Sequence, residues 1–270
     1  MTVRRPLFYV WHSLLVIVIG VPLVVEMAHA ESESCPLPAR HAGVIFPVEQ
    51  VTASWACRLQ PITNNYTTAN KIGPIRTALT EEIYGYLLDH PPMAAHLVNR
   101  LDLGLYKAAA KAPDVFWASD GEGTEGVAQL VYRDRFTRIY YLEGRHDGTL
   151  LPSVTGKAVA LLRIQPVQGL NGSAAMDTTL VAYLRLDNRF LSGVMSVLRP
   201  LIGKVVTRQF MKAFHAADRL GDLMRHDPGR VLFEAMDPPP LPDDQVAFLK
   251  HVLSNPQFTG PATESMQPFP

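Results

Sequence analysis

The stretch from residue 188 to residue 225 constrains the fold more than any other part of this 270-residue chain. Its apolar residues recur at helical spacing, with arginine and lysine between them, so it predicts a long helix with one broad apolar face. The residues of that face are Phe190, Val194, Leu198, Leu201, Val205, Phe210, Phe214, Ala217, Leu220 and Met224. A straight helix of this length would run roughly 57 Å, so we expect Pro200 to divide it into a short and a long segment. A face of this size needs a sheet to cover it.

Six runs with the length and composition of β-strands precede this helix. They are Tyr106–Ala110, Val115–Ser119, Val127–Arg133, Phe136–Leu142, Lys157–Ile164 and Thr178–Leu186. Short turns between them favour antiparallel pairing, and alternation predicts that the even-numbered residues of the last two runs point inward. In the run 136–142 either the even-numbered residues, with Tyr140, or the odd-numbered ones, with Tyr141, could face inward, and both interpretations stay open.

Two short helices are expected before the strands. Thr80 is suited to cap the first, and the pair Pro91-Pro92 can end it and open the second, up to Leu101. Residues 31–73 show no sustained period, so they predict an irregular leader. After the long helix, residues 227–270 predict a satellite helix over Asp243–Ser254, followed by a tail.

The first thirty residues have the pattern of a signal peptide. Arg4 and Arg5 precede an apolar run, and Ala28-His29-Ala30 is typical of a signal-peptidase site. Cleavage after Ala30 predicts a periplasmic or secreted protein. The alternative is a membrane anchor that is never cleaved, because the run is about long enough to span a bilayer. We favour cleavage, since Pro22 and the Ala-x-Ala site suit a peptide that is removed.

The chain has two cysteines, Cys35 and Cys57, and both lie in the part that would be exported. In an oxidising compartment they predict one disulfide, which would stabilise the fold by about 3 kcal/mol through loop entropy. Metal binding by two isolated cysteines is disfavoured.

No motif of the sequence predicts a nucleotide, metal or catalytic site. Gly121–Gly126 matches G-x-G-x-x-G, but a strand-like run follows it and acidic residues surround it, so a hairpin loop is favoured over a nucleotide site. His90 and His96 alone lack the ligands for a metal. The net formal charge of zero, without a nucleic-acid motif, argues against DNA or RNA binding. We therefore expect no cofactor and no catalytic residue.

Several charged residues fall among the strands: Arg133, Arg138, Glu143, Arg163, Arg185 and Asp187. Alternation places most of them on a solvated outer face. Arg133 and Arg138 are exceptions, because each stands beside aromatic residues, where an inward arginine could meet an acidic group of a ligand.

The element order, two short helices, antiparallel strands and a long C-terminal helix, resembles the helix-grip fold of the START-like (SRPBCC) superfamily. The resemblance covers about residues 74–226, and Val181–Asp187 passing into Asn188-Arg-Phe-Leu is similar to the passage from last strand to helix in bacterial members. It implies an α+β fold in which a curved sheet of about six to seven strands wraps the helix around a hydrophobic cavity. The family usually opens with a strand, for which Lys71–Arg76 is a poor candidate because Pro74 suits only a sheet edge.

These observations predict an exported carrier or binding protein for a hydrophobic small molecule, such as a lipid or sterol, held between sheet and helix. A transient membrane contact is compatible with that role, and the oligomeric state is not indicated. The residues expected to bind the ligand are Arg138, Tyr140, Tyr141, Leu162, Leu184, Val194, Leu198 and Leu201. One alternative is an enzyme of the cyclase, aromatase or hydrolase type, acting through pocket groups such as Tyr140, Tyr141, Arg138 or Asp187. Another is a non-catalytic structural protein of the envelope.

Overall fold

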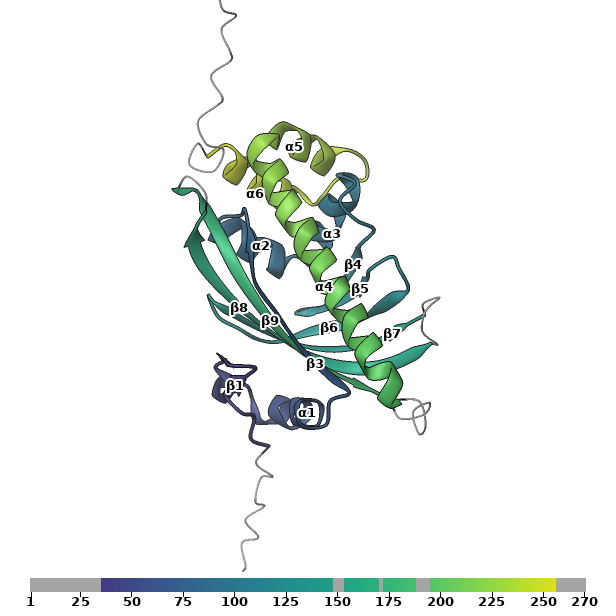
Figure 1. Ribbon diagram of the computed structural model, residues 1–270. Helices are drawn as coiled ribbons and strands as arrows, with labels where there is room; N and C mark the ends of the chain where they lie inside the picture. Colours follow the sequence, from purple (N-terminus) through teal and green to yellow (C-terminus); the bar gives the residue numbers. More distant parts are fainter. Residues whose placement is uncertain (1–34, 148–152, 170–171, 188–194, 256–270) are drawn as a thin grey trace, which may run out of the picture. The chain divides into compact units, whose positions relative to one another are not determined.

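The computed structural model describes residues 35–147, 153–169, 172–187 and 195–255 (Figure 1). The predicted signal peptide, Val194 and the tail from residue 256 lie outside this range. The elements in chain order are β1 (Arg40–His41), β2 (Val44–Ile45), η1 (Val48–Gln50), α1 (Ala53–Asn64), β3 (Thr68–Thr77), α2 (Glu81–Asp89), α3 (Pro91–Arg100), β4 (Lys107–Ala112), β5 (Val115–Ser119), β6 (Thr124–Arg133), β7 (Thr137–His146), β8 (Val154–Gln168), β9 (Ala174–Leu186), α4 (Met195–His226), α5 (Pro228–Met236) and α6 (Asp243–Leu253). No helix of these ranges is both long and apolar enough to cross a bilayer.

Strands β3 to β9 form one antiparallel sheet in the order β3-β9-β8-β7-β6-β5-β4. The six predicted strands are all present, and β5 has the predicted bounds. The first strand of the sheet pairs with the last, so the helix that follows β9 starts beside β3. With the long helix α4 on one face of this sheet, the predicted α+β class is confirmed (Figure 1).

Both faces of the sheet are covered, and the register assigns each residue to one of them. Tyr140 pairs with Ala160, whose side chain packs in the same cluster as Phe214 of α4. Tyr141 pairs with Val159 and packs in a second cluster on the opposite face. The face of the strand 136–142 that was left open is therefore resolved, with the even-numbered residues toward α4.

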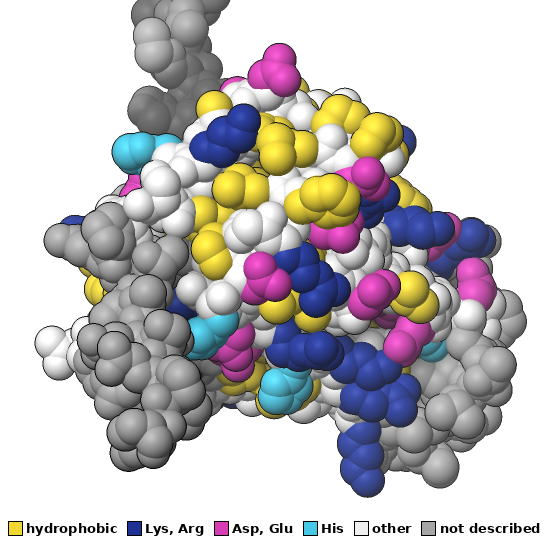
Figure 2. Space-filling view, turned by 90° about the horizontal axis from the view of Figure 1, so that it is seen from above, with side chains coloured by type: hydrophobic (Ala, Val, Ile, Leu, Met, Phe, Trp, Pro, Cys, Tyr) yellow, Lys and Arg dark blue, Asp and Glu magenta, His cyan; other side chains and the backbone are white. Residues whose placement is uncertain are grey.

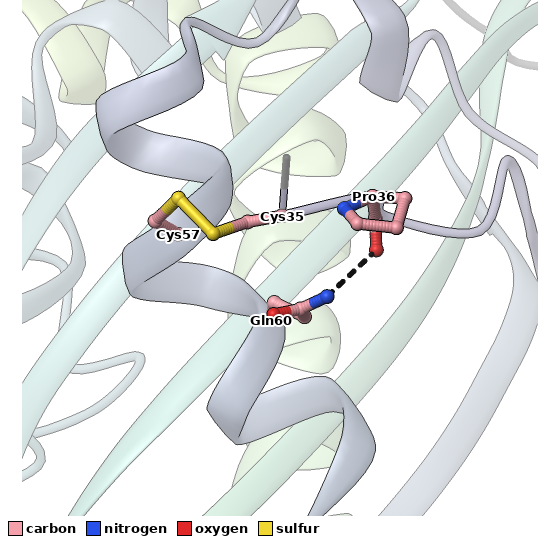
Figure 3. Close-up of a disulfide and its surroundings, with 4 residues drawn as sticks. All are labelled: Cys35, Pro36, Cys57 and Gln60. Carbon is pink, nitrogen blue, oxygen red and sulfur yellow. Dashed lines mark hydrogen bonds between the residues drawn. A yellow bond between two sulfur atoms is a disulfide. The ribbon is translucent and has the colours of Figure 1, made fainter. Parts of the chain in front are cut away.

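Residues 35–64 cover the opposite face, and we call them the N-terminal cover. Phe46, Leu59 and Ile62 are almost completely buried against the sheet residues Ile139 and Val181. A disulfide joins Cys35 to Cys57 of α1, as predicted, and the Gln60 amide donates to the Pro36 carbonyl beside it at 3.3 Å (Figure 3). The segment expected to be an irregular leader thus contains a twelve-residue helix, because its apolar residues pack on the sheet although they show no clear period.

β3 begins in this leader and includes Lys71–Arg76, which seemed a poor candidate for a strand. β3 lies at the edge of the sheet, where proline is tolerated because it need not donate a hydrogen bond to a further strand. The register of pairing with β9 shifts between Ile72 and Ile75, on either side of Pro74. Gly73 has φ +100°, and a Cβ at this position would lie 2.4 Å from the Thr178 carbonyl oxygen. Only glycine permits this close approach of two strands.

Helix α4 is continuous from Met195 to His226, so the expected division at Pro200 does not occur. About one turn of the described helix precedes Pro200, so the backbone bond that proline removes lies near the N-terminal end of the described part. Residues 188–194, the expected beginning of this helix, lie outside the described ranges. The helix packs mainly along β3.

The C-terminal half of α4 belongs to a helical cluster with α2, α3, α5 and α6. Its centre contains Met93, Leu220, Met224, Val231 and Leu249, all with 1% exposure or less. The predicted capping by Thr80 is present, since its side chain accepts a hydrogen bond from the Ile83 amide. The helix over Asp243–Ser254 was expected to be a satellite, but the apolar residues of α5 and α6 belong to this helical cluster.

Candidate functional site

The interface between α4 and the sheet is closely packed along one margin only. Ile72 of β3, Leu180 and Ala182 of β9 and Phe214 of α4 are each exposed by less than 10%. Their side chains meet with little space between them, as in an ordinary protein core. This margin fixes the helix on the sheet.

Toward β7 and β6 the side chains of the same interface are less fully buried. Leu142 and Tyr140 of β7 face α4, and Phe210 and Met211 of the helix belong to the same cluster, yet all four are only half-buried. Leu130 of β6, which pairs with Tyr140, is half-buried too. Apolar side chains from both walls therefore keep accessible surface although they face one another. We call this region the open half of the interface.

The hairpin between β5 and β6 bounds this region by contacting α4. The Glu122 carboxylate accepts from the Lys212 ammonium at 2.6 Å and from the Gln209 amide at 3.1 Å. These hydrogen bonds, led by the one from Lys212, lower the pKa of Glu122. α4 contacts β3 at one margin of the sheet and Glu122 at the other. The helix is therefore fixed to the sheet at both margins.

Hydrogen bonds and glycines in the turn between β5 and β6 fix the position of Glu122. The Asp120 carboxylate accepts from the backbone amides of Glu122 and Thr124 at 2.8 and 2.9 Å, which fixes the turn. Gly121 has φ +70°, and a Cβ there would lie 2.6 Å from the Leu105 carbonyl oxygen. The G-x-G-x-x-G match thus spans a hairpin loop, as the sequence favoured, and its last glycine, Gly126, already lies in β6, where a Cβ would be 2.4 Å from the Glu143 carbonyl oxygen.

The phenol of Tyr140 brings a polar group into the open half. Within the described chain its hydroxyl makes no hydrogen bond, although burial raises its pKa to about 12. By contrast, the neighbouring Tyr84 hydroxyl is 2.8 Å from the Thr178 hydroxyl and is satisfied. The Tyr140 side chain is itself only half-buried, and its hydroxyl is not one of the fully buried polar atoms that lack a partner.

Arg138 lies on the same face of β7 and is almost completely buried, but its donors are used internally. Its Nε and Nη2 donate to one oxygen of Asp89, at 3.3 and 3.1 Å, and its Nη1 donates to the carbonyls of Asp134 and Thr137. Arg133 has ion pairs with Asp89 at 3.7 Å and with Asp114 at 3.6 Å, and it is half-exposed. Neither arginine is therefore a free ligand for an acidic group.

Of the other predicted ligand-binding residues, Leu162 and Leu184 line the α4 face and are half-buried. Leu198 and Leu201 belong to α4, in a part whose side chains are not described. Tyr141 does not join them, because its ring lies on the covered outer face, 5.6 Å from Trp55, with the Arg58 guanidinium 4.9 Å from its centre. We therefore remove Tyr141 from the site.

A cavity of about 320 Å³ lies elsewhere, at the ends of β8 and β9, and it is lined by Lys157, Arg185, Leu186 and Asp187. Its charged groups have partners. Lys157 pairs with Glu143 at 3.2 Å, Arg185 donates to a backbone carbonyl of α1, and Asp187 accepts from a threonine hydroxyl. Asp187 thus belongs to this cavity and not to the region around Tyr140, so the two residues do not form one catalytic group.

Metal-binding side chains do not gather anywhere in the described ranges. His90 stacks on Tyr86 at 3.9 Å and its Nδ1 lies 2.8 Å from the Tyr86 carbonyl oxygen, while His96 lies near Arg100 and Glu234. The two histidines therefore have separate surroundings.

The charged side chains are unevenly distributed on the face that Figure 2 shows. Apolar side chains gather in the upper part of this view, and Lys and Arg side chains gather toward its lower edge, with acidic side chains beside them. Phe233 and Met236 of α5 are exposed by 64% and 45%, but two side chains make a small apolar area. We place no site there.

Comparison with known proteins adds little to this geometry. No family model and no curated protein sequence matches the chain. A solved structure of a conserved protein from Geobacillus kaustophilus is similar over 57% of this chain and 95% of its own, with 8% sequence identity and a TM-score of 0.35.

Proposed function

We propose that this chain is an exported binding or carrier protein of the START-like, helix-grip type, which holds a hydrophobic small molecule in the open half of the α4 interface. The observation that supports it best is the pair of half-buried apolar walls, with Leu142 and Tyr140 on one side and Phe210 and Met211 on the other. Pockets for small molecules are mostly apolar and carry a few oriented polar groups. An apolar guest would bury these side chains where the chain itself leaves them half-exposed.

The topology supports the helix-grip part of the proposal. A strand, two helices, six further antiparallel strands and a long helix follow one another, and the first and last strands are neighbours. The sheet contacts the helix at β3 and again through Glu122. A binding region enclosed by these two contacts is the arrangement that the sequence resemblance implies.

The polar groups near this region favour binding over catalysis. Arg138 and Asp89 are committed to each other, and Tyr84 is committed to Thr178. A general acid or base needs a group whose pKa lies near the working pH, whereas burial moves the pKa of Tyr140 further from it. Its hydroxyl is suited to orienting a ligand.

Export is supported by the disulfide. Cys35 and Cys57 are joined, and disulfides persist in oxidising compartments outside the cytosol. The predicted cleavage after Ala30 would leave both cysteines in the mature chain. N-terminal sequencing of the protein recovered from its host would test this: a first residue of Glu31 is expected, and an intact residue 1 would contradict cleavage.

Two measurements test the binding function. Organic extraction of protein purified from its native compartment, followed by mass spectrometry, should release a hydrophobic molecule in a fixed ratio to protein. After extraction, the refolded protein should bind the neutral fluorophore N-phenyl-1-naphthylamine with an increase in emission. Absence of both a bound molecule and probe binding would overturn the proposal.

A further inference from the structure

We propose that the exposed side of α4 is a docking surface for an anionic lipid bilayer, which it meets through one row of basic side chains. The residues of this row, which we call the basic row, are Lys204, Arg208, Lys212 and Arg219. They follow one another at intervals of one, one and two helical turns, so they lie on one face of the helix. All four are exposed. The inference goes beyond the proposed binding function and does not depend on it.

The apolar pattern of α4 explains why its outer side is polar. Ile202, Phe214 and Leu220 are buried against the sheet and the helical cluster, so the opposite side of the helix faces solvent. Between positions 204 and 226 the exposed residues include no large apolar side chain. They are Lys204, Arg208, Lys212, Ala213, His215, Arg219, Asp222 and His226.

Most of the basic row has no acidic partner in the described part of the chain. Lys212 pairs with Glu122 at 2.6 Å, whereas Lys204, Arg208 and Arg219 form no ion pair there. By contrast, several cations on the sheet are ion-paired, namely Arg76, Arg135, Arg145 and Lys157. The unpaired positive charge of this protein is therefore concentrated along one side of one helix (Figure 1).

The acidic residues beside the basic row only partly offset its charge. The lowered pKa of Glu122 follows mainly from its hydrogen bond with Lys212, and the charge of Arg208 adds a smaller effect. Asp218 is half-buried and accepts from the backbone amide that follows β3, at 3.2 Å. Asp222 is exposed at the end of the row. Four cations thus meet two exposed carboxylates, and the row keeps a positive charge although the whole chain has none.

The composition of the basic row favours a lipid surface over a protein partner. Protein interfaces centre on aromatic and other apolar side chains, which the exposed side of α4 lacks. From Lys204 to Arg219 the helix axis runs about 22 Å, so a flat surface of phosphate groups can meet all four cations at once. Each basic residue close to an anionic bilayer strengthens binding about fivefold.

Sedimentation with lipid vesicles tests this surface. The protein recovered from its host is mixed, at about pH 8 where exposed histidines are neutral, with vesicles of phosphatidylcholine alone or of equal parts of phosphatidylcholine and phosphatidylglycerol. The wild type is compared with the double variants Lys204→Gln/Arg208→Gln and Lys107→Gln/Lys111→Gln. The control lysines are exposed on β4 and form no ion pair with described residues, so both variants lose the same charge.

The wild type should bind the anionic vesicles and not the neutral ones. Salt at about 0.5 M should release it, because the Debye length then falls to roughly 4 Å. Lys204→Gln/Arg208→Gln should bind the anionic vesicles about 25-fold more weakly, since two cations are lost at about fivefold each. Lys107→Gln/Lys111→Gln should stay within about twofold of the wild type, because charges away from the docked surface are screened.

Three results would overturn the inference: no binding to the anionic vesicles, equal binding to the neutral ones, or equal losses in the two double variants. Binding of soluble poly-glutamate but not of vesicles would assign the basic row to an acidic protein. The comparison of the two vesicle types needs only the wild type, so it decides even if a variant does not fold.

Binding of N-phenyl-1-naphthylamine, measured without vesicles, reports the proposed function separately. Both double variants should bind this probe like the wild type. If the wild type binds anionic vesicles as expected but not the probe, the docking surface stands and the proposed function fails.

Discussion

Filling the open half of the interface should affect binding and stability in opposite ways from filling the packed half. Leu142 and Leu180 are both leucines on the α4 face of the sheet, but Leu142 is half-buried and Leu180 is 1% exposed. Tryptophan at position 180 has no free space to occupy, so overpacking should cost about 1–3 kcal/mol. At position 142 the side chain is only half-buried, so the larger ring can extend toward solvent and the cost should stay below about 1 kcal/mol.

Thermal unfolding and probe binding measure the two effects. For a domain of this size about 1 kcal/mol shifts the Tm by roughly 2–4 °C, so Leu180→Trp should melt about 2–12 °C below the wild type. Leu142→Trp should melt within a few degrees of the wild type but bind N-phenyl-1-naphthylamine at least tenfold more weakly. Val127→Trp, at a 39% exposed position on the other face, serves as the control for the ring itself.

The refuting result is specific. If Leu142→Trp is destabilised as much as Leu180→Trp, the side chains of β7 already pack tightly against α4. If it keeps full stability and full binding, the probe binds elsewhere. Either outcome contradicts the reasoning from the two halves of the interface.

Three further predictions concern other contacts of the fold. Replacing Cys35 and Cys57 together by serine should lower the free energy of unfolding by about 3 kcal/mol in chemical denaturation, and a loss below about 1 kcal/mol would mean that the closed loop is not ordered by folding. Burial lowers the pKa of His41 in the folded protein, so the unfolded chain binds the proton first as the pH falls below about 6.5. The free energy of unfolding should therefore fall by up to about 1.4 kcal/mol per pH unit in that range. If the dependence of this free energy on pH is the same in His41→Gln, the prediction is wrong. Glu122→Gln should cost less than about 1 kcal/mol, because the contact with Lys212 is half-exposed, yet it should speed probe release at low salt, and an unchanged release rate would exclude the hairpin as a barrier.

The strands could be predicted because their alternation and turn residues are local signals. β5 ends at the expected residues, since aspartate and glycine follow it directly. β8 is longer than predicted, running from Val154 to Gln168, because Gly156 near its start and Pro166 near its end are residues typical of loops in sequence. Hydrogen bonding to β7 and β9 keeps these ends extended.

β3 and α1 could not be predicted, because each contains a residue that usually breaks its element. Pro74 is tolerated in β3 only through the edge position, and Pro61 lies inside α1 close to its C-terminal end. Edge position is a property of the whole sheet, which the local sequence does not carry. For the same reason the pairing of Asp89 with Arg138, 49 residues apart, had no signal in the sequence.

The inward face of β7 was undetermined for a different reason. Alternation of apolar and polar residues identifies the inward face of a strand when the other face is exposed to solvent. In β7, however, Ile139 and Tyr141 are buried under the N-terminal cover while Tyr140 faces α4. Both parities are therefore apolar. The apolar residues of the cover itself, such as Phe46 and Leu59, were the signal that a second face needed burial.

This second face explains how an interface can stay open without loss of the fold. An unfilled interface forfeits packing contacts, so a domain with only that core would be weakly stable. Here the cover closes one core around Ile139, and the helical cluster closes another around Leu220 and Met224 of α4. The second core anchors the C-terminal half of the helix, while Phe210 on the preceding turns remains half-buried. Stability and ligand binding are thus assigned to different parts of α4, and a variant such as Phe210→Ala should lose affinity for the apolar probe before it loses its fold.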